Sequence, residues 1–152
     1  MNRFPRGRSC AALLVGALLL VPVAAALGAA DDEAIKAAAL DYAEGWLTGD
    51  EERMSRALHP EMLKRRVVTE LLSDTQTVQM LDAETLVRAT REGVGVGGGL
   101  LTFRVAILDQ HGDMAVVRVV SELYVEYLHL VRWEGRWVIL SVLWGTIASP
   151  GD

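Results

Sequence analysis

Apolar positions follow a helical period in the first half of the chain and an alternating period in the second half. Over residues 32–47 (DEAIKAAALDYAEGWL) they recur every three or four positions, which predicts a helix with one apolar face. Asp50 and Asp82 are typical helix-capping residues and predict two shorter helices, over 51–58 and 82–92. The first half of the chain is therefore expected to be mainly helical.

From Leu101 onward, polar and apolar residues alternate, which is the pattern of strands with one buried face. Four long segments show this alternation, namely 101–109, 114–123, 124–133 and 136–145. Two short strands are also predicted, over 64–72 and 76–81. The order predicts an α+β domain in which three N-terminal helices pack on an antiparallel sheet of about four long C-terminal strands plus short ones.

Two arginines indicate which face of this sheet points into the protein. Arg104 and Arg118 fall on the same face, and burying both side chains would carry a large desolvation cost. We therefore expect this face to point outward together with Tyr127 and His129. Glu126 then points inward.

The turn of the last hairpin sets the register of its two strands. A two-residue turn at 134–135 pairs Tyr127 with Val142 and His129 with Leu140. An odd-length turn before the third long strand would instead exchange the faces of the last two strands, because side chains alternate between faces.

The outward face is more apolar than a monomer usually leaves exposed. We expect a partner to cover it, most simply a second copy of the chain; the C-terminal tail is the alternative. The residues expected in such a dimer interface are Tyr127, His129, Leu140, Val142 and Trp144.

Residues 1–30 have the features of a signal peptide. Three arginines precede an apolar stretch, and small residues follow it, with cleavage expected after Ala26 or Ala30. An uncleaved anchor is the alternative, although the apolar stretch is short for a membrane span. The expected product is a periplasmic or secreted protein with one domain over 31–146 and a short tail over 147–152, with no membrane attachment after cleavage.

Charge and cysteine content narrow the possible partners. The chain has 15 basic and 20 acidic residues; without the three arginines of the signal peptide the balance is 12 to 20, or net −8. Such an acidic domain is not expected to bind nucleic acid through bulk charge. The only cysteine, Cys10, lies in the predicted signal peptide, and the three histidines lack metal-ligand spacing, so neither a metal nor a cofactor is expected.

The inward face carries the candidate chemistry. Glu126 lies at a polar end of an apolar wall, where a carboxylate could act as an acid or base or simply cap the sheet. His59, before Pro60, is the other candidate base, although a histidine there commonly closes a helix. The residues expected around a ligand are Tyr42, Trp46, Tyr124, Glu126, Trp137, Ser121 and Ser141.

Two further motifs give weaker signals. The basic run KRR at 64–66 could bind an anion, but a solvated edge strand is the preferred interpretation. The segment GVGVGG at 93–98 fits G-x-G-x-x-G, yet it follows a helix and leads into a strand, which is the reverse of a dinucleotide site.

Several segments together resemble the putative lumazine-binding family of the nuclear transport factor 2-like (NTF2-like) superfamily, which also contains SnoaL-like cyclases and ketosteroid-isomerase-like domains. The resemblance rests on GW..GD at the end of the first helix, on ALHP, and on YVEYLHLV...GRW.I..VLW in the last hairpin. It implies a cone in which a curved sheet wraps around helices and encloses a pocket, often in a dimer. No complete catalytic set of the superfamily can be matched.

These observations predict an exported binder of a small, aromatic or heterocyclic, lumazine-like molecule. One alternative is an isomerase, dehydratase or cyclase that uses Glu126 or His59 as an acid or base. Another is a homodimeric or heteromeric interaction module that works through the outer face of the sheet.

Overall fold

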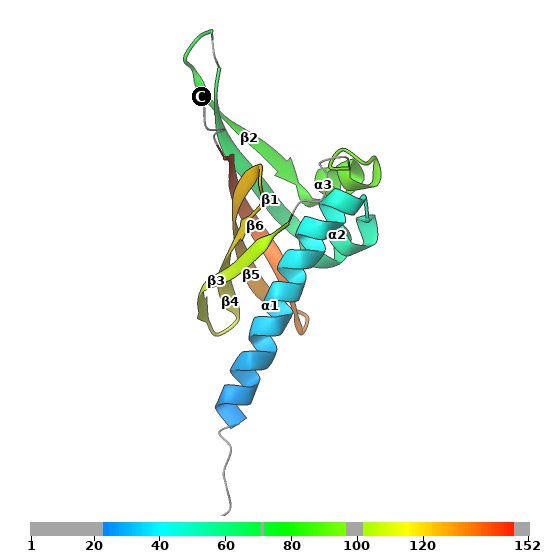
Figure 1. Ribbon diagram of the computed structural model, residues 1–152, viewed down its shortest axis with the longest axis vertical. Helices are drawn as coiled ribbons and strands as arrows, with labels where there is room; N and C mark the ends of the chain where they lie inside the picture. The colour runs from blue at the N-terminus through cyan, green and yellow to red at the C-terminus, as the bar shows by residue number, and fades with distance from the viewer. Residues whose placement is uncertain (1–22, 71, 97–101, 148–152) are drawn as a thin grey trace, which may run out of the picture.

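The computed structural model describes residues 23–70, 72–96 and 102–147, which form three helices and six strands. Figure 1 shows their arrangement. In chain order the elements are α1 (Val23–Thr48), α2 (Glu51–Ala57), β1 (Leu58–Thr69), β2 (Gln76–Asp82), α3 (Ala83–Arg91), β3 (Arg104–His111), β4 (Met114–Val120), β5 (Tyr124–Trp133) and β6 (Arg136–Thr146). The α+β class is confirmed, and α3 follows the first two strands, in agreement with the predicted order of strands 64–72 and 76–81 before helix 82–92.

The predicted capping residues do start the two short helices. The carboxylate of Asp50 accepts a hydrogen bond from the Arg53 amide at 3.0 Å, and that of Asp82 accepts one from the Thr85 amide at 2.8 Å. Each bond satisfies an amide that has no partner within its helix. Gly49, with φ +71°, adopts the left-handed conformation that ends α1 and turns the chain into α2.

Helix α1 begins at Val23, inside the segment predicted as a signal peptide, rather than at residue 32. Among the α1 side chains that the structure describes, from Ala30 onward, Ile35 is the first that is fully buried. Asp31 ties this end of α1 to β5, since it accepts a hydrogen bond from Arg132 at 2.6 Å. No helix among the described residues is both long and apolar enough to span a membrane.

One acidic residue clamps α1 to α2. Asp41 accepts hydrogen bonds from Arg53 at 2.9 Å and from Arg56 at 2.8 Å, one on each carboxylate oxygen. Burial alone would raise the pKa of Asp41, but the bonds from Arg56 and Arg53 outweigh it and hold the pKa below its usual value. The ionised carboxylate therefore stabilises the contact between the two helices.

This clamp predicts a specific loss of stability in acid. Because the pKa of Asp41 is lowered in the folded state, its contribution is complete above the unfolded pKa of about 4 and is lost as the pH falls through the folded value. In urea unfolding from pH 7 to pH 2, Asp41→Asn should be less stable than the wild type at pH 7, and the difference should shrink below about pH 4. Asp74→Asn is the matched control, since no described residue bonds the Asp74 side chain and its substitution should change the stability little. A constant difference across the pH range would contradict the account.

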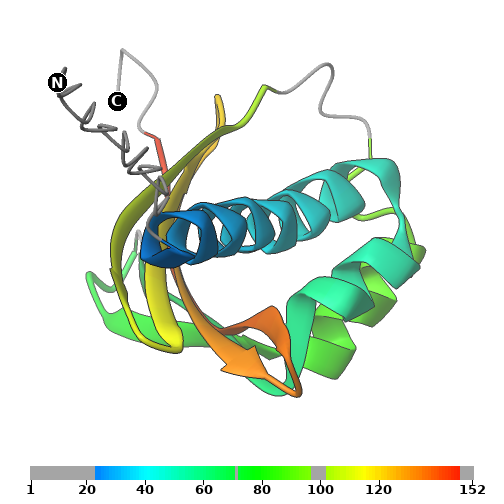
Figure 2. The ribbon, with the colours of Figure 1, turned by 90° about the horizontal axis from the view of Figure 1, so that it is seen from below.

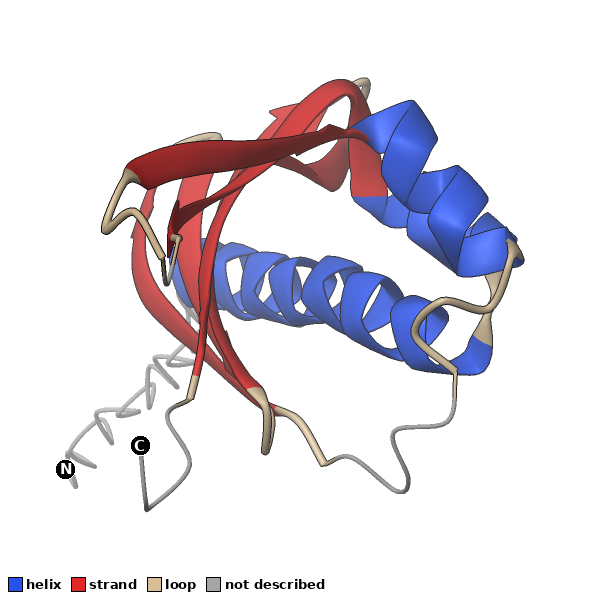
Figure 3. Ribbon diagram, turned by 90° about the horizontal axis from the view of Figure 1, so that it is seen from above, coloured by secondary structure: helices blue, strands red, loops and turns tan. Residues whose placement is uncertain are grey.

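The six strands form one curved sheet in the order β2-β1-β6-β5-β4-β3. The prediction of a purely antiparallel sheet is wrong at one pairing, because β1 and β6 run parallel. Strands β3 to β6 form a meander. Strand β1 follows α2 in the chain and pairs with β6 on the side away from β5, a placement that local periodicity does not specify. Figures 2 and 3 show α1 lying across the concave side of the sheet, with α2 and α3 beyond one end of it.

The predicted faces hold in β5 and in the first half of β6. Glu126 is 8% exposed and Tyr127 is 40% exposed, while Arg104 and Arg118 both lie in solvent. Trp137 and Ile139 point inward with Leu128 and Leu130, as expected. The desolvation cost of the arginines is therefore a sound guide to orientation.

A β-bulge at Leu140 reverses the prediction for the second half of β6. Leu130 pairs with Ile139, but His129 pairs with Ser141 and Tyr127 with Leu143, so Leu140 is an extra residue in its strand. Beyond the bulge every side chain lies on the face opposite to the one predicted. Val142 is a buried core residue and Trp144 faces the interior, so neither belongs to an outward interface.

Candidate functional site

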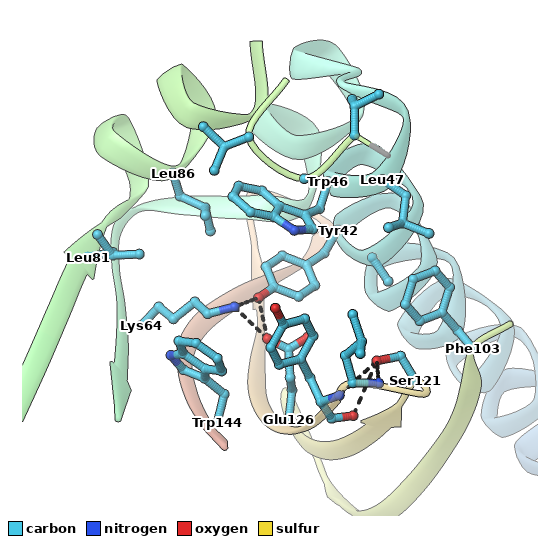
Figure 4. A pocket seen from close by; sticks show the side chains of 16 residues that line it. Tyr42, Trp46, Leu47, Lys64, Leu81, Leu86, Phe103, Ser121, Glu126 and Trp144 are labelled. Carbon is cyan, nitrogen blue, oxygen red and sulfur yellow. Dashed lines mark hydrogen bonds and ion pairs between the residues drawn. The ribbon is translucent and has the colours of Figure 1, made fainter. Parts of the chain in front are cut away.

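A cavity of about 380 Å³ lies between α1 and the inner face of the sheet. It is bounded by the C-terminal half of α1, the turn after α3, the start of β5 and the end of β6 (Figure 4). Its wall is mainly apolar, with the polar groups gathered at one side. The lining residues are Tyr42, Ala43, Trp46, Leu47, Lys64, Leu81, Leu86, Val94, Gly95, Val96, Phe103, Ser121, Leu123, Tyr124, Glu126 and Trp144.

Three side chains from three elements meet at the polar side of the cavity. Glu126 Oε1 accepts hydrogen bonds from Tyr42 Oη at 2.8 Å and from Lys64 Nζ at 2.5 Å. Lys64 Nζ also donates to Tyr42 Oη at 2.6 Å, which closes the triangle. The Lys64 and Glu126 side chains are only 13% and 11% exposed, so the ion pair belongs to the wall of the cavity rather than to the outer surface.

The surroundings of Tyr42 keep its hydroxyl protonated. Burial raises the pKa of Tyr42 well above its usual range, and the charge and hydrogen bond of Glu126 raise it further. The phenol is therefore a fixed donor to the carboxylate at neutral pH. It orients Glu126 toward the cavity and does not serve as a base.

Aromatic rings enclose the ammonium group and extend the wall. Lys64 Nζ lies 4.7 Å from the centre of the Trp144 ring and 5.3 Å from that of Tyr42, distances at which a cation is attracted to the ring face. Tyr124 contacts Trp144 edge to face at 5.4 Å between centroids. Arg66 lies over Trp144 as well, with 4.3 Å between Cζ and the ring centre, and so helps to hold the indole in place.

The opposite wall is formed by Trp46 and the turn that follows α3. A Cβ on Gly95 would lie 2.4 Å from the Trp46 carbonyl oxygen and 2.5 Å from its indole Nε1, so only glycine permits this approach. Gly95 thus has a packing role against the cavity wall. This is consistent with rejecting GVGVGG as a nucleotide motif; Gly98 of that motif lies outside the described residues.

Gly95→Ala is expected to displace either Trp46 or the turn, with a cost of about 1 to 3 kcal/mol in the free energy of unfolding. Urea unfolding measures the cost, and the tryptophan emission spectrum reports the change around Trp46. Gly145→Ala is the control, because nothing lies within 4 Å of its added Cβ. Equal behaviour of the two variants would contradict the close packing of Gly95 on Trp46.

Five of the residues predicted around a ligand do line the cavity: Tyr42, Trp46, Ser121, Tyr124 and Glu126. Two do not. Trp137 packs in the core, where Arg132 covers its ring at 4.8 Å, and Ser141 lies beyond the bulge on the outer face, with its Oγ 2.8 Å from His129 Nδ1. Ser121 serves mainly to shape the turn before β5, since its Oγ accepts the Tyr124 amide at 3.0 Å.

His59, the second candidate base, lies outside this cavity. Its Nδ1 accepts a hydrogen bond from the Glu61 amide at 3.1 Å, and its ring packs edge to face on Trp133 at 4.8 Å. These contacts close the end of α2 and the start of β1. These contacts support a structural role for His59 rather than a catalytic one.

Of the residues predicted for a dimer interface, Tyr127, His129 and Leu140 are exposed on the outer face of the sheet. Leu143, exposed by 57%, takes the place that Val142 was expected to fill. The outer face is thus still apolar, although its composition differs from the prediction.

The most important residue missed from the sequence is Lys64. The basic run KRR predicts a solvated edge strand, but β2 forms the edge and β1 lies one strand further in. Only the parallel pairing of β1 with β6 brings Lys64 to Trp144 and Glu126, and no local pattern reveals that pairing. Phe103 is also part of the wall.

No group of three or more potential metal ligands occurs in the part of the chain that the structure describes. The site is defined instead by an ion pair, a phenol and several aromatic rings. Such a wall can bind a planar molecule by stacking and orient it by hydrogen bonds.

Comparison with known proteins identifies the family. The sequence model described as Putative lumazine-binding matches residues 30–145. No functionally curated protein matches the chain. Among solved structures, an NTF2-like protein of unknown function from Shewanella baltica has a TM-score of 0.59 at 18% identity, with 80% of this chain and 97% of that chain covered.

Two further structures show the same architecture. An NTF2-like protein from Silicibacter pomeroyi has a TM-score of 0.62 at 14% identity, with 79% of this chain and 98% of that chain covered. A ketosteroid isomerase-like protein from Erwinia carotovora atroseptica has a TM-score of 0.56 at 15% identity, with 77% and 96% covered. The chain belongs to the putative lumazine-binding family and has the NTF2-like fold.

Proposed function

We propose that the protein binds a small, planar aromatic or heterocyclic molecule in the cavity between α1 and the sheet. The observation that carries this proposal is the composition of the wall, in which Trp46, Tyr124 and Trp144 provide ring surfaces beside one polar group, the Glu126–Lys64 pair. Apolar walls with a few convergent polar groups are typical of ligand sites. The volume of about 380 Å³ suits a molecule of two or three fused rings.

The proposal is tested by isothermal titration calorimetry and thermal unfolding with a panel of aromatic compounds, including lumazine, flavins and steroids. We expect at least one planar compound to bind and to raise Tm. A Trp144→Ala variant should weaken that binding, whereas Trp133→Ala, which changes an indole outside the cavity wall, should not. A panel without any binder would contradict the proposal.

The alternative function is an isomerase, dehydratase or cyclase that uses Glu126 as its acid or base. It is favoured by one observation, the convergence of Glu126, Tyr42 and Lys64 within hydrogen-bond reach. The same contacts weaken it, because a carboxylate paired with an ammonium group is a poorer base than a free one. Turnover of a ligand found by calorimetry, and its loss in Glu126→Gln, would favour the enzyme over the binder.

We also propose export and self-association. Export rests on the signal-peptide features of residues 1–30, and N-terminal sequencing of the protein from the periplasm or medium tests it.

Self-association rests on the exposed apolar side chains Tyr127, Leu140 and Leu143 of the outer face. Sedimentation of the wild type should show a dimer and Tyr127→Lys a monomer; a monomeric wild type would contradict this.

A further inference from the structure

The ion pair in the cavity wall does not use all of its hydrogen-bonding capacity. Both bonds that Glu126 accepts from described residues go to Oε1, and Oε2 accepts none from them. The Lys64 ammonium group has three N–H bonds and uses two of them, one to Tyr42 and one to Glu126. One acceptor and one donor thus remain side by side on two residues that line the cavity.

The unused acceptor of Glu126 and the unused donor of Lys64 limit the kinds of ligand that can fill the cavity. A ring that displaced water from Glu126 and Lys64 without replacing its hydrogen bonds would leave two charged groups unsatisfied, which is costly in a low-dielectric cavity. A carboxylate ligand would meet the negative charge of Glu126, and an amine would meet the positive charge of Lys64. The neutral pair favours a neutral ligand with a donor and an acceptor on adjacent atoms.

We propose that the cavity recognises the lactam or imide edge of a planar heterocycle, that is, a ring N–H next to a ring carbonyl. The ring N–H donates to Glu126 Oε2, and the carbonyl oxygen accepts from Lys64 Nζ. Stacking against Trp46, Tyr124 and Trp144 holds the plane of the ring. This inference rests on the proposed function and specifies the chemical class of its ligand.

The test uses three probes of the same ring size with the wild-type protein: quinazoline-2,4-dione, its 1,3-dimethyl derivative, and quinazoline. The dione has the lactam edge, the dimethyl compound lacks its N–H donors, and quinazoline lacks both groups. Calorimetry should show the dione binding at least about 10-fold more tightly than either of the others. In Lys64→Met the advantage of the dione over quinazoline should shrink, while the affinity for quinazoline changes little.

The outcomes separate this inference from the proposed function. If quinazoline binds as tightly as the dione, the cavity binds aromatic rings without reading their edge, so the proposed function stands and this inference is wrong. If the dimethyl compound alone binds weakly, its methyl groups are only too large, and the inference is again wrong. If neither these probes nor any other aromatic compound binds, both proposals are overturned. The comparison of the three probes needs only the wild type, so it remains decisive if the Lys64→Met variant does not fold.

Discussion

Replacing Glu126 with leucine should lower the free energy of unfolding by about 3 kcal/mol, because it leaves the Lys64 ammonium group unpaired in a mostly buried position. Lys64→Met should have a comparable effect for the reciprocal reason. Removing both charges together in Lys64→Met/Glu126→Leu should recover part of the loss, since no buried charge is then unpaired, although the buried Tyr42 hydroxyl loses both of its partners. Urea unfolding of the four proteins gives the coupling energy directly.

An exposed ion pair supplies the control for this cycle. Glu33 lies 3.8 Å from Lys36 on α1, and its side chain is 82% exposed. Glu33→Leu should therefore change the stability by less than about 0.5 kcal/mol. If Glu126→Leu costs no more than Glu33→Leu, Lys64 and Glu126 do not form a mostly buried ion pair.

The second large effect is expected at two adjacent residues of β6. Val142 is 2% exposed and packs in the core, so Val142→Asp buries an unpaired carboxylate and should cost about 4 kcal/mol or prevent folding. Leu143 is 57% exposed, and Leu143→Asp should change the stability of the monomer by less than about 0.5 kcal/mol. Urea unfolding compares the two variants in the Tyr127→Lys background, which is expected to be monomeric, so that the proposed dimer contact of Leu143 does not contribute.

The alanine pair keeps this test useful if Val142→Asp does not fold. In the same monomeric background, Val142→Ala should cost about 2 kcal/mol and Leu143→Ala less than about 0.5 kcal/mol. A regular hairpin without the bulge at Leu140 predicts the opposite order. Greater sensitivity at Leu143 than at Val142 would thus show that the register of β6 is wrong.

The difference between β5 and β6 shows what can be predicted from a sequence of this kind. Side-chain alternation and the cost of burying Arg104 and Arg118 were enough to place Glu126 inside and Tyr127 outside. The bulge has no comparable signal, because Leu140 is apolar like its neighbours and a single extra residue leaves the local pattern almost unchanged. Every assignment after it was therefore inverted.

The residues of the candidate site also differ in whether a local sequence pattern predicts their positions. Tyr42 and Trp46 share a helical face, so their common orientation follows from the helical period. Lys64 comes from a strand that joins the sheet through a parallel, non-local pairing, and the energy of that pairing depends on the whole fold. The aromatic wall could thus be partly predicted, whereas its polar partner could not.

The four tryptophans of the chain allow one direct measurement of the proposed site. Trp46 and Trp144 line the cavity, whereas Trp133 and Trp137 lie away from it. In a titration of ¹⁵N-labelled protein with the tightest aromatic binder, the indole N–H resonances of Trp46 and Trp144 should shift and those of Trp133 and Trp137 should stay in place. Shifts confined to Trp133 and Trp137 would place the ligand elsewhere and contradict the account.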